Sequence, residues 1–274
     1  MNLEGIIIYK TAYKERDLIC KLLLRSGKLV TLYFYGGRGG GKAQKGSILE
    51  VGYMLRVTMA PRRKKLDQDI LIAKEWTLLW EPANIRNDFQ AFYLVSFFFE
   101  VSQKIAIDED IKYLGEFEEE HQGIFNVLSN AIFNIDKAVK EKNFEVFPQL
   151  FLYLIKLTYH LGVVPNYRSC QHCDVDLKSV ELAKFEPQHG GFTCYDCLVQ
   201  KDENLSENRF LFEELKNSKQ LIAYIEHTLG LNYKNYIDLK DIPRGSCEAV
   251  FNYFCYQFHL QAIQFKTWSF IIKS

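Results

Sequence analysis

The chain has 274 residues, of which 48% are hydrophobic and 25% are charged. This composition is typical of a folded globular protein and excludes a mainly disordered chain. The formal net charge is zero, but residues 1–80 carry 15 Lys and Arg against 7 Asp and Glu, whereas residues 81–274 carry 19 against 27. A basic first part joined to an acidic remainder predicts that one region meets a polyanion and the other does not.

Nothing in the chain is typical of export or membrane insertion. The first ten residues include Glu4 and Lys10 and contain no apolar run followed by a cleavage site. The most apolar stretch, 92–99, stops at Glu100 and is far shorter than the roughly 20 residues that a membrane span needs. We therefore expect a soluble, cytoplasmic protein with no membrane partner.

Residues 1–80 have the pattern of β-structure. Ser26-Gly27 is typical of a hairpin turn. In the fourth strand-like run we expect Val51, Tyr53, Leu55 and Val57 to share one face. The strand-like runs are 5–9, 17–25, 28–35, 48–59 and 70–79. Short strands at this density predict a small closed barrel, because closure removes exposed sheet edges.

After residue 81 the apolar period becomes helical. In the first expected helix, Phe89, Phe92, Tyr93 and Ser96 have the spacing of one face. The helices on either side of a cysteine-bearing insert are expected to pack as one bundle. The expected helices are 87–107, 122–142, 145–162, one starting near 206, and 246–265.

The predicted fold class is therefore multidomain α+β. Its parts are an N-terminal β-barrel at 1–80, a helical domain formed by 81–165 and 202–274, and an insert at 166–201.

Four of the seven cysteines form two C-x-x-C pairs. Cys170 and Cys173 make the first pair, Cys194 and Cys197 make the second, and the pairs are 20 residues apart. Two such pairs can supply four thiolates to a tetrahedral Zn²⁺ ion. Two disulfides are the alternative, which a cytoplasmic location disfavours. Because four protein ligands leave no position for water, we expect one structural, non-catalytic zinc ion per chain.

The other cysteines and two nearby histidines have simpler interpretations. Cys20, Cys247 and Cys255 lie in apolar segments and are expected to be buried reduced thiols. His172 and His189 lie near the cysteine pairs and could replace a cysteine ligand, but four thiolates already complete the shell.

Segment 33–46 has features of a phosphate-binding loop. Gly36, Gly41 and Lys42 fit G-x-x-x-x-G-K, but Ala43 stands where a Mg²⁺-binding hydroxyl belongs. A loop of that kind must also open a helix, whereas the sequence that follows is strand-like. An NTPase is therefore disfavoured.

The same segment and the one after residue 60 are rich in cations. Between positions 36 and 65, eight basic residues stand against one acid, Glu50. Such loops neutralise a phosphate backbone with little regard for its sequence. Tyr33 and Tyr35 are expected to face outward and stack on bases, with Phe34 on the opposite side of the strand. The predicted phosphate-binding residues are Arg38, Lys42, Lys45, Arg56, Arg62, Arg63, Lys64 and Lys65.

Three stretches carry a specific combination of motifs. In GIIIYKTAYKERDLICKLLLRSGKLVTLYFYGGRGGGKAQKGSILEVG, Tyr13, Glu15 and Asp17 precede a strand hairpin and a basic loop. LTYHLGVVPNYRSCQHC fits L-G-x-x-P-x-x-x-x-C-x-x-C, and FEPQHGGFTCYDC has an aromatic residue, Gly-Gly and C-x-x-C in order. Together these stretches, within 4–200, resemble the RecO family of bacterial recombination mediators.

The resemblance implies an oligonucleotide-binding (OB) barrel, a helical domain and a zinc-binding insert. It implies binding of single- and double-stranded DNA, annealing of complementary strands, partnership with RecR and a place on the nucleoid. It also implies help in loading RecA onto DNA coated by single-stranded DNA-binding protein (SSB), whose acidic tail docks on RecO. The family often has a basic residue where Lys156 stands, so we hypothesise that Lys156 receives the tail's carboxylates. The alternative is a lysine stem lying along a helix flank.

The leading hypothesis is a non-enzymatic protein that binds and anneals DNA. The six histidines are not arranged with a nucleophile, and Asp67 and Asp69 beside four cations are interpreted as loop charges. The alternative is an interaction scaffold whose barrel and zinc module bind proteins, with DNA contact incidental.

Overall fold

The computed structural model describes residues 1–38, 48–59, 71–108, 122–201, 209–233, 235, 239 and 241–273. The chain divides into two compact units, Met1–Phe144 and Glu145–Ser274. The first unit holds the predicted barrel and the second holds both cysteine pairs. The segments 81–144 and 145–165 of the predicted helical domain fall in different units. Within the described ranges, no helix has the length and apolar character needed to cross a membrane.

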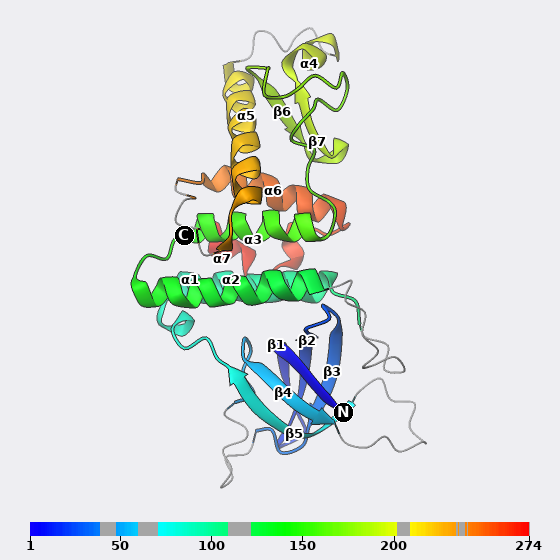
Figure 1. Cartoon of the computed structure of the whole chain (residues 1–274), viewed down its shortest axis with the longest axis vertical. Helices are drawn as coiled ribbons and strands as arrows, with labels where there is room; N and C mark the ends of the chain where they lie inside the picture. Colours follow the sequence, from blue (N-terminus) through cyan, green and yellow to red (C-terminus); the bar gives the residue numbers. More distant parts are fainter. Residues whose placement is uncertain are drawn as a thin grey trace. The chain divides into compact units, whose positions relative to one another are not determined.

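The predicted closed barrel is confirmed. Its strands follow the order β1-β2-β3-β5-β4 around the barrel (Figure 1). All neighbouring pairs are antiparallel except β3 and β5, which are parallel. This arrangement is consistent with an OB-like fold. The strands are β1 (Asn2–Tyr13), β2 (Asp17–Leu24), β3 (Leu29–Phe34), β4 (Met54–Met59) and β5 (Leu71–Trp80).

Strand alternation fills the barrel interior. Phe34 is fully buried, and its ring meets Trp76 edge-on at 5.0 Å. The predicted hairpin turn is present, with Gly27 at φ +83° and its N–H donating to the carbonyl of Leu24. Cys20 is a buried free thiol, as predicted. Further interior residues are Leu18, Leu22, Leu24, Val30, Leu32, Leu55, Val57, Leu71 and Ala73.

The predicted start of the fourth strand is wrong. β4 begins at Met54, and Val51 and Tyr53 lie before it in a turn. Gly52 has φ +92°, which an extended strand does not permit, and its N–H donates to the carbonyl of Ile7. The turn therefore seats the chain against β1 before β4 starts.

The first long helix, α1 (Phe89–Ile105), begins and ends two residues inside the predicted range 87–107, and the residues expected to share one face are not the ones it buries. Asp88 caps it by accepting a 2.8 Å hydrogen bond from the N–H of Ala91. Phe89 and Phe92 are exposed and line a cavity of about 880 Å³. Apolar residues surround most of this helix, so periodicity alone did not identify its packed face. The buried residues include Leu94, Val95, Phe97, Phe98, Phe99 and Val101.

One carboxylate fastens the segment after the barrel to the second helix, α2 (Gln122–Glu141). Asp136 Oδ1 accepts hydrogen bonds from the N–H groups of Asn84 at 2.6 Å and Ile85 at 3.1 Å. Its Oδ2 accepts another from the Asn84 side chain at 2.8 Å. These bonds satisfy the N–H groups that open a short 3₁₀ helix, Ile85–Asn87.

The second unit joins helices to a small hairpin. Part of the predicted bundle is present. The helix just before the insert, α3, contacts α5 and α6 after it, whereas α1 and α2 belong to the first unit. The last long helix ends at Gln257, eight residues before the predicted end, and His259 beyond it has φ +53°. Cys247 and Cys255 are buried, as predicted. The elements are α3 (Val146–His160), β6 (Ala183–Glu186), β7 (Gly191–Cys194), α4 (Tyr195–Lys201), α5 (Arg209–Gly230), α6 (Arg244–Gln257) and α7 (Trp268–Ile271).

Truncating the buried ring of the barrel should be costly. We expect Phe34→Ala to lower the free energy of unfolding by about 3–5 kcal/mol, because it removes apolar contacts and leaves a cavity. Phe89→Ala is the matched control, since that ring is 66% exposed, and it should cost less than about 1 kcal/mol. Urea denaturation of both variants measures the difference, and equal losses would contradict the assignment of Phe34 to the core.

Candidate metal centre and nucleic-acid interface

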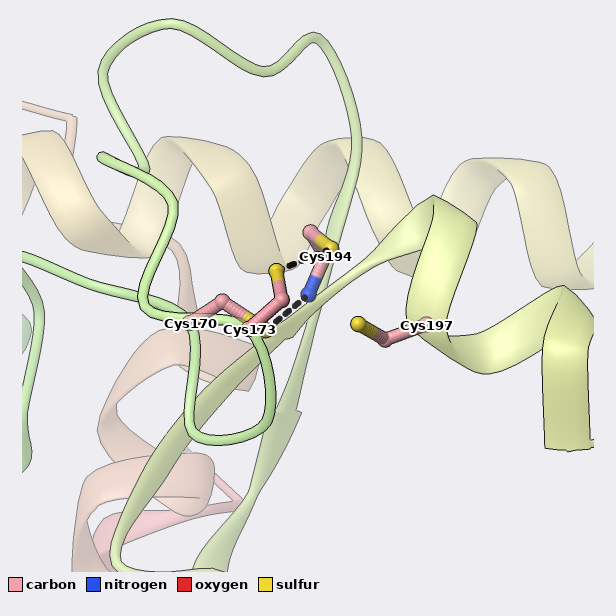
Figure 2. A group of neighbouring side chains, drawn as sticks. All are labelled: Cys170, Cys173, Cys194 and Cys197. Atoms are coloured by element: carbon pink, nitrogen blue, oxygen red, sulfur yellow. Dashed lines mark hydrogen bonds between the residues drawn. The ribbon is translucent and has the colours of Figure 1, made fainter.

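The four paired cysteines come from three elements of the second unit. Cys170 and Cys173 lie on the loop between α3 and β6, Cys194 ends β7, and Cys197 lies in the first turn of α4. Figure 2 shows the four side chains converging. Three of them are buried and Cys173 is exposed. The structure thus brings together all four residues that the sequence predicted as ligands.

Their spacing suits a tetrahedral metal ion. The four Sγ atoms lie within 4.8 Å of one another, and those of Cys173 and Cys194 are 3.6 Å apart. Two thiolates bound to one zinc ion at about 2.3 Å lie about 3.8 Å apart in ideal tetrahedral geometry. All four cysteines are free thiols. The cluster can therefore hold a metal ion.

The environment of the four sulfurs shifts the pKa values of individual cysteines in opposite directions. Burial alone would raise the pKa of Cys170, but backbone N–H groups, including those of Cys194 and His172 at 3.4 Å, lower it to about 6. Burial and the neighbouring sulfurs raise the pKa of Cys197. Four thiolates this close repel one another, and a divalent cation removes that cost.

Backbone contacts position the first cysteine pair on the hairpin. The N–H of Gln171 donates to the carbonyl of Phe192 in β7 at 3.0 Å, and the N–H of Cys170 donates to Val175 at 2.9 Å. Gly191 lies so close to Asn166 that a Cβ atom on Gly191 would be 2.6 Å from the carbonyl oxygen of Asn166. Only glycine fits this approach of the loop to β7.

A modest apolar contact supports the hairpin. The ring of Phe185 in β6 lies 4.8 Å from Phe192 and 5.8 Å from Tyr253 of α6. Leu198 of α4 and Leu215 of α5 form a separate small buried cluster. The buried apolar side chains of this region, cysteines aside, are Leu177, Ala183, Phe185, Phe192 and Leu198, a small core that a bound metal ion could reinforce.

The first unit carries a second candidate site, which we call the tyrosine surface: Tyr13, Tyr33 and Tyr35. Tyr33 lies between the other two, with its ring 5.5 Å from that of Tyr13 and 4.5 Å from that of Tyr35. Tyr13 is 44% exposed and Tyr35 is 59% exposed. Phe34 points into the barrel, so the predicted alternation along this strand is confirmed.

Asp17 holds the middle of the tyrosine surface. Its Oδ2 accepts a 2.5 Å hydrogen bond from the hydroxyl of Tyr33, and its Oδ1 accepts one from the N–H of Gly36 at 2.8 Å. The bond to Asp17 raises the pKa of Tyr33 to about 12, because ionised Tyr33 would lose the bond and face a like charge. Tyr33 is therefore a fixed neutral hydroxyl at neutral pH.

The predicted cations have different placements. Arg38 is exposed, and its N–H donates to the carbonyl of Arg16 at 2.8 Å, which joins the loop after β3 to the turn between β1 and β2. Arg56 pairs with Glu4 at 2.7 Å across β4 and β1, and this ion pair accounts for its position without a nucleic acid. The remaining six, Lys42, Lys45, Arg62, Arg63, Lys64 and Lys65, lie outside the described residues.

Lys156 has a protein partner. Its Nζ donates to the carbonyl of Leu229 at 2.9 Å, in the last turn of α5, and burial lowers its pKa. A cation at this point complements the carbonyl end of the helix. Its role as a receptor for an acidic tail stays a prediction.

Sequence reasoning did not assign a binding role to Tyr13, Lys14 or Asp17. Tyr13 ends β1 opposite Asp17, and Lys14 Nζ lies 5.5 Å from the centre of the Tyr13 ring. Tyr13 and Asp17 belong to the motif that precedes the hairpin, so the signal was present. Hairpin pairing of β1, β2 and β3 is what brings that motif beside Tyr33.

Metal removal should loosen the insert selectively. We expect a chelator to open residues 166–201 to trypsin at Arg168, Lys178 or Lys184, because structural zinc in peptides contributes about 10–16 kcal/mol to folding. Cys173→Ser should reproduce this without chelator, whereas Cys255→Ser should not. Digestion followed by mass spectrometry locates the cuts. An insert equally resistant with and without chelator would contradict a structural metal.

Removing the charge of Asp17 should lower the pKa of Tyr33 toward that of an ordinary tyrosine. We expect the pKa of Tyr33 to fall from about 12 toward 10.0 in Asp17→Asn, because the like charge and the charged acceptor are both lost. Titration of ¹³C-labelled tyrosine by NMR measures this value. Glu15→Gln, a neighbouring exposed carboxylate, should leave it near 12. An unchanged pKa in Asp17→Asn would show that the hydrogen bond does not control Tyr33.

Comparison with known proteins adds no family assignment. No protein-family model matches the chain, and a search of curated proteins finds no match. The resemblance to the RecO family therefore rests on the three motif-bearing stretches.

Proposed function

We propose that the barrel binds single-stranded DNA through the tyrosine surface. The observation that carries this proposal is the row of three rings, of which the outer two are 44% and 59% exposed and the middle one is tied to Asp17. Exposed rings on a barrel can stack on bases of any sequence, at about 1–3 kcal/mol per base. A row held in place loses little side-chain freedom on binding.

Both basic segments attach to the barrel near this row. Segment 39–47 follows Arg38, three residues beyond Tyr35. Segment 60–70 leads into β5, whose first residue, Leu71, pairs with Leu32 next to Tyr33. Cations carried at these two points would neutralise phosphates of a strand whose bases stack on the tyrosines. This explains why the basic excess of the chain is confined to its first 80 residues.

We further propose that the cysteine cluster binds one Zn²⁺ ion with a structural role. Four thiolates at near-tetrahedral spacing favour zinc, and a site filled by four protein ligands leaves no position for a reacting water. The bound ion would hold the loop of Cys170 and Cys173 against β7 and α4. It would thus support the fold of the second unit.

Together with the motif resemblance, these sites support a recombination mediator of the RecO type. In this role the protein binds single- and double-stranded DNA, anneals complementary strands and acts with RecR to load RecA onto SSB-coated DNA. The stacking surface suits annealing because it holds bases without reading their sequence. Lys156 remains the proposed contact for the acidic SSB tail.

A protein-interaction scaffold is the second candidate. Tyrosines are also enriched at protein interfaces, and Glu15 and Asp17 lie beside the tyrosine surface. The salt dependence of DNA affinity distinguishes a DNA-binding protein from a protein-interaction scaffold. Contact with about six phosphates on a single strand should give log K against log salt a slope near −4, whereas a flat response would favour the scaffold.

Truncating the exposed rings should weaken binding to an oligothymidine strand. We expect Tyr13→Ala and Tyr35→Ala each to cost about 1–3 kcal/mol, since each removes one stacked base. Tyr256→Ala, a 53% exposed tyrosine of the second unit, is the matched control and should bind like the wild type. Fluorescence anisotropy at fixed salt measures these affinities, and wild-type affinity in the double variant Tyr13→Ala/Tyr35→Ala would overturn the proposed site.

A further inference from the structure

Three metal-binding side chains outside the cysteine cluster converge in the second unit. His172 lies between the two cysteines of the first pair, and Glu186 is the last residue of β6. His189 ends the short 3₁₀ helix Pro187–His189 that follows β6. One ligand atom from each of the three residues lies within 4.8 Å of the other two.

Their geometry is that of ligands to one ion. His189 Nδ1 lies 3.4 Å from Glu186 Oε2, and two such atoms bound to tetrahedral zinc at about 2.0–2.1 Å lie about 3.3 Å apart. The rings of His172 and His189 are 5.8 Å apart and nearly perpendicular, at 77°. Edge-on rings at this distance can direct a nitrogen from each toward a common point.

The ligand set is chemically selective. Two imidazoles, which are borderline ligands, together with one carboxylate, which is a hard ligand, suit Zn²⁺, Co²⁺ and Ni²⁺, whereas Mg²⁺ and Ca²⁺ prefer oxygen ligands only. Three protein ligands leave a coordination position open, and both histidines are exposed. Solvent or an external ligand can reach an ion at that position.

A hydrogen bond from Thr193, which is not itself one of the three candidate ligands, orients the carboxylate of Glu186. Thr193, fully buried in β7, donates its hydroxyl to Glu186 Oε2. Metal-binding carboxylates are characteristically held by hydrogen bonds of this kind. Because Thr193 precedes Cys194 and His172 lies between Cys170 and Cys173, both ligand clusters are built on the same loop and strand.

We propose that His172, Glu186 and His189 form a second metal site, which binds a divalent transition-metal ion and keeps one position open. The cysteine cluster and this site differ in chemistry. The first is closed and sulfur-only, whereas the second is open and made of nitrogen and oxygen. The second site is independent of DNA binding by the barrel and does not require the proposed recombination function.

The test uses the full chain already holding one tightly bound metal ion, as established by elemental analysis. Titration with Co²⁺, followed by calorimetry and absorption spectroscopy, should reveal about one further ion per chain. Its absorption should lack the sulfur-to-cobalt charge-transfer band that thiolate ligands give. His189→Ala and Glu186→Gln should each weaken this second binding at least about tenfold and retain the first ion.

The controls separate ligand loss from misfolding. His227→Ala removes an exposed histidine of α5 and should bind the second ion like the wild type. Glu186→Gln keeps the size of the side chain, so retention of the first ion in this variant shows that the loop and strand remain folded. Absence of a second ion in the wild type, a sulfur band that grows with it, or wild-type affinity in His189→Ala would each overturn the proposal.

Discussion

Closure of the five-stranded barrel is the constraint on which the first unit depends. Closing the sheet requires β1 to pair with β4 and β3 with β5, and each pairing fixes which side chains point inward. Phe34 must then enter the core, and Tyr33 and Tyr35 must leave it. The same hairpin pairing sets Tyr13 and Asp17 beside Tyr33. The candidate DNA surface is therefore a consequence of how the core is filled.

The second unit meets its stability requirement differently. Its hairpin pairs two four-residue strands whose buried apolar side chains include Ala183, Phe185 and Phe192. Four sulfurs from a loop, a strand end and a helix start converge in the same region. A metal ion there would reinforce contacts that the loop and β7 already make, such as the hydrogen bond from Gln171 to Phe192. The arrangement has a further effect, because the loop that carries Cys170 and Cys173 also carries His172 toward Glu186 and His189. The same loop can thus position ligands for both candidate metal sites.

Prediction from sequence succeeded where a local pattern has one physical solution. The spacing of the two C-x-x-C pairs favoured a four-sulfur cluster, and period-two alternation identified Phe34 as interior. It failed where the pattern had several solutions. The aromatic residues of α1 surround the helix, so the shared face of Phe89 and Phe92 did not show which face of the helix packs. Gly52 also interrupts a run that otherwise resembles a strand, because a left-handed residue seats the chain on β1.

The sequence by itself determined the order of the barrel strands and the long helices, the closed barrel, the set of four cysteines and the confinement of the basic excess to the first 80 residues. These follow from periodicity and spacing, which are local properties of the chain. Only the tertiary structure decided that Arg56 pairs with Glu4, that Lys156 binds the end of α5, and that Tyr13 joins Tyr33 and Tyr35. It likewise assembled His172, Glu186 and His189. Except for Glu186 and His189, which are three positions apart, these contacts join residues whose approach depends on pairing or packing between elements, and no local pattern encodes that distance.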